Sequence, residues 1–235
     1  MAENKDSKLD EILTNPESIV EDIQSGKLLE FYEKYKNIIN IVAGSIAGIV
    51  IGIFGFRYYV NTQNEEAQNT MFQAVYYFEA DSLSKALNGD GANPGFVEIT
   101  ESYPFTKAAN MANFYAGTCY LKLGKYEDAI DYLKNFGASD LLIQARAYSL
   151  IGDAYLEQND YENAVTYYQK ASDYKPTKEF TPEYLMKLGL ACELNNNYES
   201  AVKAYDRIIN EFPNSNKVND ARKYKAMNEV KLSSL

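Results

Sequence analysis

The sequence predicts an all-α protein in which one membrane-spanning helix is followed by a solenoid of helical hairpins. Two observations carry this prediction. Residues 37–56 contain no charged side chain and lie between Lys36 and Arg57. From residue 108 onward, a pattern of glycine, tyrosine and alanine returns every 35 to 37 residues, which is the length of one helical hairpin. We expect about four hairpins and a C-terminal cap helix.

Composition argues against catalysis and nucleic-acid binding. The 235-residue chain has a net charge of −10, a pI of about 4.7 and no basic patch, so we expect no nucleic-acid partner. Histidine is absent, which removes the usual general base near neutral pH and the commonest metal ligand. We find no nucleophile–base pair, phosphate loop or metal spacing. The sequence therefore predicts a protein without enzyme activity, metal or cofactor, and its carboxylates are interpreted as solvated surface charges.

Residues 1–36 are polar and acidic, and we expect them to form a cytosolic tail. Asn15, Pro16 and Glu17 make a helix-start signature, and Ser25 with Gly26 marks a break. A partly ordered leader is the simpler interpretation. A small docking element is the alternative.

Residues 37–60 are predicted to be a transmembrane signal anchor. At about 1.5 Å per residue, twenty helical residues span roughly 30 Å, the thickness of the hydrocarbon core of a bilayer. A cleavable signal peptide has a short basic start and small residues at a cleavage site. Here an acidic stretch comes first and the span leaves through FRYYV. We therefore expect the anchor to remain in place.

The charges that flank the span predict its orientation. Lys27, Lys34 and Lys36 precede it, and only Arg57 follows within twenty residues. Because positive charge near a span favours the cytoplasmic side, we expect a cytoplasmic N-terminus. The C-terminal domain then lies across the bacterial inner membrane, in the periplasm of a diderm cell.

Three glycines recur every four residues within the span. Gly44, Gly48 and Gly52 place a smooth groove on one helix face, where a second helix could approach closely. The groove could pack the helix of a partner or of a second copy. The alternative is that glycine is simply common in membrane helices.

Beyond the span, we expect a degenerate first hairpin over residues 61–103. No proline or glycine occurs between Arg57 and Gly89, so the helix can continue out of the membrane as far as residue 87. The turn-rich stretch 88–95 is predicted to be a loop, and FVEITESY is expected to belong to the second helix of this hairpin.

Three clear repeats follow over residues 104–213. A small residue in the middle of the first helix lets the second helix approach, and the tyrosine and alanine of the second helix are expected to pack back onto the first. Because one such hairpin cannot bury its apolar face alone, neighbouring hairpins stack into a solenoid. The repeated positions are Gly117, Gly152 and Gly189, then Tyr126, Tyr161 and Tyr198, then Ala129, Ala164 and Ala201.

This pattern resembles the tetratricopeptide repeat. The middle copy fits the repeat signature best, the third has Cys192 where tyrosine is usual, and the first has Phe136 where a small residue is usual. Residues 214–235 are expected to hold the cap helix. The signature positions of the middle copy are Tyr148, Ile151, Gly152, Tyr155, Tyr161, Ala164, Tyr168, Ala171 and Pro176, and the third copy matches at Leu185, Leu188, Gly189, Tyr198, Ala201, Tyr205 and Pro213.

The two cysteines fall on first helices two repeats apart. Packed helices lie roughly 8–10 Å from axis to axis, and further helices intervene. Cys119 and Cys192 are therefore too far apart for a disulfide, which requires Cα atoms within about 7 Å. We interpret both as small buried apolar residues.

The resemblance implies a protein-binding concave face lined by the first helices. Exposed Phe and Met there would mark an apolar groove, unless the solenoid itself covers them. Repeats of this class that clamp a C-terminal dicarboxylate use Lys, Asn and Arg at these places, so that ligand class is disfavoured. The expected partner-binding residues are Met111, Phe114, Thr118, Leu121, Arg146, Ser149, Asp153, Glu183, Met186 and Leu190.

The whole layout resembles the YfgM-like family of bacterial inner-membrane proteins. The stretch FVEITESYPFTKAANMANFYAGTCYLKLGKYEDAI is similar to repeat proteins from Bacteroidetes. The resemblance implies an ancillary subunit of the SecYEG translocon that associates with a membrane-anchored periplasmic prolyl isomerase (PpiD-like) and handles emerging secreted chains. The alternative is a structural scaffold for another cell-envelope assembly complex.

Overall fold

The computed structural model describes residues 26–234, and every regular element within that range is a helix. The chain divides into two compact units, the first ending at Tyr59 and the second beginning at Val60. The helix start predicted at Asn15 lies outside the described residues.

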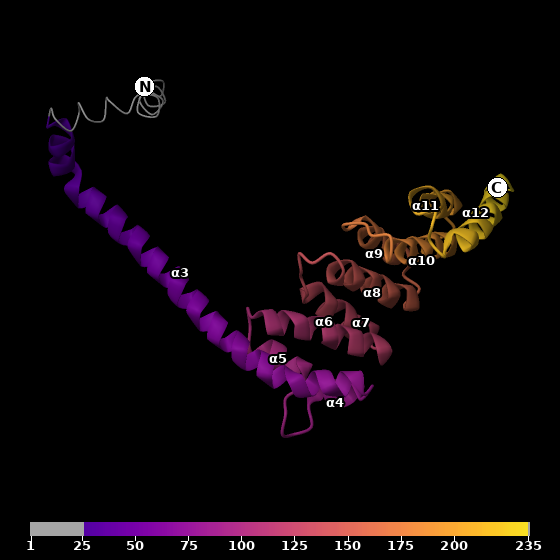
Figure 1. The fold of residues 1–235 in the computed structure, drawn as a ribbon, viewed down its shortest axis with the longest axis horizontal. Helices are drawn as coiled ribbons and strands as arrows, with labels where there is room; N and C mark the ends of the chain where they lie inside the picture. The colour runs from indigo at the N-terminus through magenta and orange to yellow at the C-terminus, as the bar shows by residue number, and fades with distance from the viewer. Residues whose placement is uncertain (1–25, 235) are drawn as a thin grey trace. The chain divides into compact units, whose positions relative to one another are not determined.

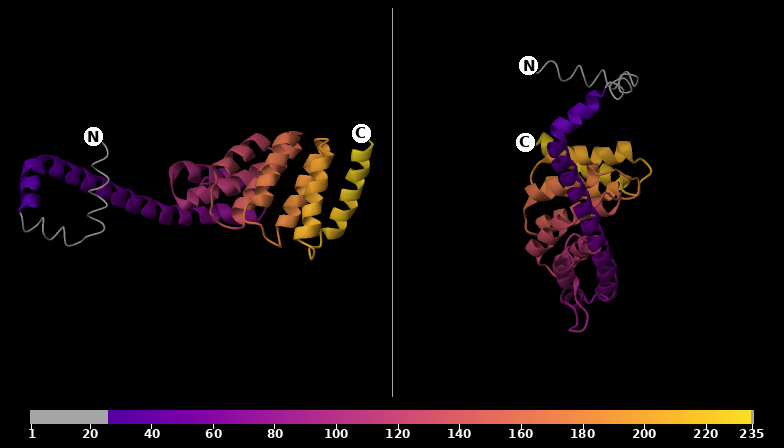
Figure 2. Two further views of the ribbon diagram at one scale, coloured as in Figure 1. Left: turned by 90° about the horizontal axis from the view of Figure 1, so that it is seen from above. Right: turned by 90° about the vertical axis from the view of Figure 1, so that its left-hand side faces the viewer.

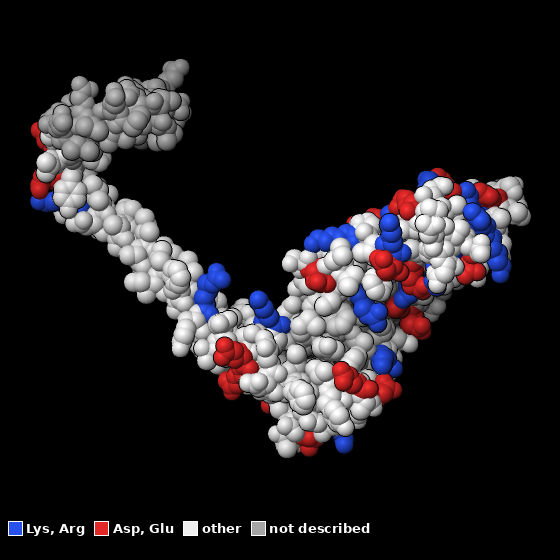
Figure 3. Space-filling model, viewed as in Figure 1, with Lys and Arg blue, Asp and Glu red and all other residues white. Residues whose placement is uncertain are grey.

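The first described helix, α3, covers Lys27–Glu79 and includes the predicted span. It begins directly after Gly26, whose backbone has a φ of 72°. No residue of its apolar central stretch is buried, and Figure 3 shows no charged side chain there. By length and composition α3 is able to cross a membrane.

Helix α3 ends earlier than the sequence predicts. It stops at Glu79, and the chain resumes as the short helix α4 over Leu83–Asn88. Asp81 adopts a left-handed φ of 54°, and the Ser82 N–H donates to the Tyr77 carbonyl at 2.8 Å. This is a Schellman-type ending, which aspartate tolerates better than most residues. Neither proline nor glycine is needed for it, so the sequence pattern did not reveal it.

The turn brings α4 and α5, Phe96–Ser102, against the end of α3. Phe96 and Ile99 are fully buried in a cluster with Phe78 of α3. The Phe78 and Phe96 rings pack at 6.5 Å in an edge-to-face arrangement. The second arm of the expected first hairpin therefore consists of two short helices, joined by a loop at residues 89–95.

Three regular hairpins and one further helix complete the second unit, and each of these helices packs on the next in chain order. Figure 2 shows them side by side. The hairpins are α6 and α7 (Lys107–Lys122 and Tyr126–Asn135), α8 and α9 (Ile143–Glu157 and Tyr161–Asp173), and α10 and α11 (Thr181–Leu194 and Tyr198–Glu211), followed by α12 (Val218–Ser233).

The same turn joins the two helices of every hairpin. A residue with positive φ ends the first helix: Gly124, Asn159 or Asn196. In the second and third copies, the next residue caps the following helix, because Asp160 and Asn197 accept from backbone N–H groups three residues on. The polar turn sequences therefore specify both the end of one helix and the start of the next.

Helix α12 begins later than expected. Residues 212–217 form turns, with the Ser215 N–H donating to the Phe212 carbonyl, and the helix begins at Val218. Val218 and Ala221 then join the buried cluster that contains Tyr205. Helix α12 thus covers the apolar side of α11.

The glycine in each first helix lies against a large side chain of the second helix. A Cβ added at Gly189 would lie 2.4 Å from ring carbons of Tyr205, and one at Gly152 would lie 2.7 Å from the Tyr168 ring. At Gly117 the opposing side chain is Leu133. Contacts below 3 Å are excluded for real carbon atoms, so only glycine permits this helix separation.

The sequence pattern did not indicate which side chain lies against each glycine. Tyr126, Tyr161 and Tyr198 lie at the start of the second helices and are half-buried. The side chain that contacts the glycine lies seven residues after this tyrosine, two turns further along the same helix. Ala129, Ala164 and Ala201 are fully buried, as predicted.

Both cysteines are free and buried, which confirms the absence of a disulfide between them. Burial raises the pKa of Cys119 to about 12 and that of Cys192 to about 11. Both thiols therefore remain neutral at physiological pH and pack as apolar groups.

We predict that Gly189→Ala lowers the free energy of unfolding by about 1–3 kcal/mol, because the new methyl group overlaps the buried Tyr205 ring. Chemical denaturation of the full chain in detergent, followed by circular dichroism, measures the change. Gly137→Ala is the matched control, since nothing lies within 4 Å of a Cβ at that exposed position. Equal stability of the two variants would contradict the close-approach argument.

Candidate protein-binding face

The predicted face draws on α6, α8 and α10, and the structure buries three of its residues. Phe114, Thr118 and Ser149 are each less than a tenth exposed. Phe114 packs against Phe136, with ring centroids 5.3 Å apart, in the cluster that joins α6 and α7 to α8. The Thr118 hydroxyl donates to the Phe114 carbonyl at 2.8 Å. The solenoid itself covers these side chains because they fill the space between neighbouring hairpins.

Three further apolar members are half-buried. Met111 and Leu121 pack against the same cluster as Phe114, and Met186 packs against the cluster of α10 and α11. Each presents only part of its surface. These three side chains therefore form only a small part of the accessible surface of the face.

Asp153 and Lys187 form the polar centre of this face. Lys187 Nζ lies 2.8 Å from both carboxylate oxygens of Asp153 and 3.3 Å from Ser149 Oγ. The Tyr168 hydroxyl donates to Asp153 Oδ1 at 2.7 Å. One carboxylate thus ties α8 to α9 and α10. Burial raises the pKa of Tyr168 far above its usual value, so this hydroxyl stays protonated and acts as a donor.

The remaining predicted members lie nearer the solvent. Lys217 Nζ lies 2.6 Å from Glu183 Oε2, and this ion pair links α10 to the segment before α12. Arg146 and Leu190 are exposed. Leu190 has 46% of its surface accessible, so it is the most exposed apolar residue of the predicted set.

Sequence reasoning missed two parts of this surface. Lys187 was not predicted, although it holds Asp153. Exposed apolar residues also occur at Leu194 on α10 and at Val230 on α12, where 68% of the residue surface is accessible. The spacing of four residues from Leu190 to Leu194 is a helical-face signal that could have identified Leu194. Val230 was overlooked because the sequence of α12 is polar as a whole.

The acidic side chains of this region make contacts between helices. Among residues 26–234, no group of three His, Cys, Asp or Glu side chains could hold a metal ion. The Asp153 carboxylate is occupied by Lys187 and Tyr168, and Glu193 accepts from the Tyr205 hydroxyl at 2.6 Å. Desolvation by burial is the main cause of the raised pKa of Tyr205. These carboxylates hold helices together.

Within the first unit, the glycine row of α3 lies open among the described residues. No described atom would lie within 4 Å of a Cβ at Gly44, Gly48 or Gly52. The proposed groove for a second helix therefore stays a prediction about a partner outside this chain.

Comparisons with known families agree with the hairpin pattern. Residues 149–216 and residues 111–139 each match a family model described as a tetratricopeptide repeat. The second unit is thus built on tetratricopeptide repeats, a class of helical solenoid that mediates protein–protein interaction. No curated protein matches the chain.

We predict that Asp153→Ala lowers the free energy of unfolding by about 1–3 kcal/mol, because it leaves the buried Tyr168 hydroxyl and the Lys187 ammonium without their acceptor. Asp153→Asn keeps one oxygen for Tyr168 and should recover part of the loss. Urea denaturation monitored by tyrosine fluorescence measures both variants.

Glu199→Ala is the matched control, since it removes a carboxylate whose ion pair with Lys203 is exposed on both sides. We expect almost no change in stability there. A loss as large as that of Asp153→Ala would show that the position of the carboxylate does not matter.

Proposed function

We propose that this protein is a membrane-anchored module that binds other proteins through the face of α6, α8, α10 and α12. The observation that carries the proposal is the presence, in one chain, of a tetratricopeptide solenoid and of a helix able to cross a membrane. A solenoid presents an extended surface made by one helix per repeat. Anchoring that surface to a membrane raises its local concentration near membrane partners.

The C-terminal half of the face is the best candidate for contact. Leu190 and Leu194 lie exposed on α10, and Val230 lies exposed on α12. Exposed apolar side chains near ion-paired ones, such as Glu183 with Lys217, are typical of a protein interface with an apolar centre and a polar rim.

The predicted orientation assigns the partner to the far side of the membrane. Three lysines precede the span and one arginine follows it, so the solenoid is proposed to lie in the periplasm. The YfgM-like resemblance narrows the partner to the SecYEG translocon and a PpiD-like prolyl isomerase, with the solenoid handling or recruiting factors for emerging secreted chains. The second candidate is a scaffold for another cell-envelope assembly complex. The exposed glycine row of α3 supports either, because it offers a membrane partner a packing face.

Site-specific photocrosslinking on native membranes tests the proposal. A photoreactive residue at Leu190 or Leu194 is expected to give adducts with the translocon channel or with a prolyl isomerase, identified by mass spectrometry. The same group at Glu162, which is exposed on α9, is the control and should give no such adduct. Adducts with envelope-assembly proteins alone would favour the scaffold. Equal adducts from Glu162 would remove the case for this face.

We also predict that Leu190→Asp combined with Leu194→Asp lowers partner affinity about tenfold or more, since burying one leucine stabilises a complex by about 1.5–3 kcal/mol. Co-purification from detergent-solubilised membranes measures the loss. Leu123→Asp is the control, because Leu123 is equally exposed but lies in the turn after α6. Equal losses in both proteins would mean that added charge, and not the face, weakens the complex.

A further inference from the structure

Two repeats share an aromatic pair that the third repeat lacks. Tyr120 on α6 stacks on Tyr132 of α7, with ring centroids 5.2 Å apart and an interplanar angle of 27°. In the next hairpin Tyr155 stacks on Tyr167 at 5.5 Å, again at 27°. Each pair occupies the same two positions of the repeat, three residues after the glycine of the first helix and six after the first tyrosine of the second.

The third repeat has Cys192 and Ala204 at those positions. A cavity of about 200 Å³ lies there, between α9 and α11, with α10 beneath it. Its lining includes Val165 and Leu188 together with Cys192 and Ala204. The volume far exceeds that of a single water, about 30 Å³, and these four side chains are apolar. The cavity is therefore the space that aromatic rings occupy in the preceding repeat.

The polar groups around the cavity also correspond to groups that contact the tyrosine pair. In the second hairpin, Lys134 Nζ donates to the Tyr155 hydroxyl at 2.9 Å, and Lys170 Nζ lies 4.5 Å from the centroid of the Tyr167 ring. Their counterparts one repeat later are Gln169 and Arg207, and both line the cavity. Gln169 can thus donate to a phenol oxygen and Arg207 can lie against a ring face, although the cavity contains no ring.

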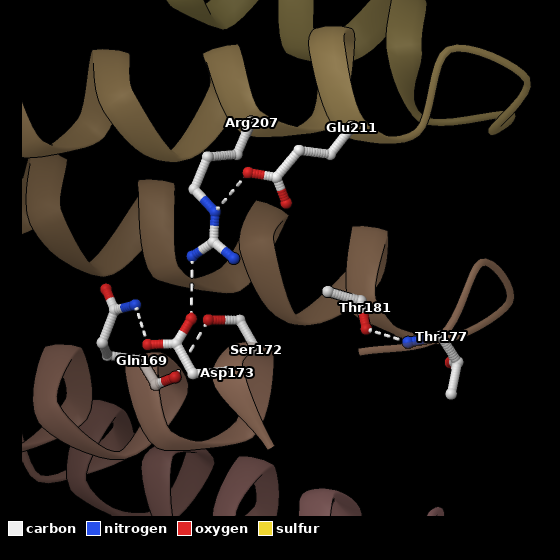
Figure 4. Close-up of polar contacts among 7 residues, drawn as sticks. All are labelled: Gln169, Ser172, Asp173, Thr177, Thr181, Arg207 and Glu211. Carbon is white, nitrogen blue, oxygen red and sulfur yellow. Dashed lines mark hydrogen bonds and ion pairs between the residues drawn. The ribbon is translucent and has the colours of Figure 1, made fainter. Parts of the chain in front are cut away.

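The side chain of Arg207 is restrained by two carboxylates of the chain itself. Its Nη1 donates to Asp173 Oδ1 at 2.9 Å and its Nε to Glu211 Oε1 at 3.1 Å. Gln169 donates to the other oxygen of Asp173 at 2.6 Å. Figure 4 shows Arg207 reaching from α11 to Asp173 on α9, with Gln169 on the same carboxylate. Because these contacts already restrain Arg207, ordering its side chain would cost little free energy when a ligand binds.

We propose that this cavity, whose lining also includes Ser200 and Lys203, is a docking site for a tyrosine side chain of a partner protein. The guest ring would take the place of the missing aromatic pair, with its face toward Cys192 and Ala204. Its hydroxyl would meet Gln169, and Arg207 would lie over its edge or face. Aromatic rings gain from sulfur and cation contacts of this kind. This site is separate from the face of α6, α8, α10 and α12, and it stands or falls independently of it.

The two cysteines of the chain provide a direct test. In protein labelled with [3-¹³C]cysteine, only Cys119 and Cys192 give signals. N-acetyl-tyrosinamide, titrated into the full chain in detergent micelles, is expected to shift the Cys192 signal in a saturable way through the ring current. Cys119 lies in a different cluster and should not move. N-acetyl-leucinamide is the comparison ligand.

The proposal is overturned if N-acetyl-tyrosinamide leaves the Cys192 signal in place, or if N-acetyl-leucinamide shifts it equally at the same concentration. A Cys192 signal that moves with protein concentration alone would also overturn it, since a second copy of the chain would then be the occupant.

Two variants fill the cavity and are expected to abolish the shift. Ala204→Tyr introduces the ring that Tyr167 supplies one repeat earlier, and Val165→Phe fills the space from α9. Either suffices if the other does not fold, as judged by circular dichroism. Ala226→Tyr is the matched control, because it adds the same ring at an exposed position of α12 and should leave the shift unchanged. A shift that persists unchanged in a folded cavity-filled variant would place the ligand elsewhere.

Discussion

The close approach of a glycine to a buried side chain of the paired helix is the contact on which the solenoid depends. Gly152 against Tyr168 and Gly189 against Tyr205 leave no room for even a methyl group. This separation lets the tyrosine hydroxyls reach acidic groups on the first helices, Asp153 and Glu193. Each buried ring therefore satisfies its polar end while its apolar body fills the core.

Because the paired helices lie so close, acidic residues on α8 and α10 form contacts that hold the helices together. Asp153 receives Tyr168 from its own hairpin and Lys187 from the next, so one carboxylate sets the spacing between two hairpins. The proposed contact surface is the exposed apolar edge at Leu190 and Leu194. A surface supported by a rigid polar network loses little entropy on binding, which suits a module that presents a preformed face.

The three regular repeats differ in one pair of aromatic residues, and this difference marks the position of the proposed docking site. The tyrosine pair is present in two hairpins and stabilises each groove by filling it. In the third hairpin a cavity of about 200 Å³ lies beside Cys192 and Ala204, and Tyr205 stacks on Tyr224 of α12. The buried core of the third hairpin thus forms without these two rings.

The sequence by itself determined the helical class, the apolar helix, the repeated hairpins and the buried alanines such as Ala164. These follow from hydrophobic patterning, turn residues and period, which are local properties of the chain. Only the tertiary structure decided the end of α3 at Glu79, the burial of Phe114 and Ser149, and which side chain lies against each glycine. Such outcomes depend on which surfaces meet when hairpins stack, and residues distant along the chain set that contact.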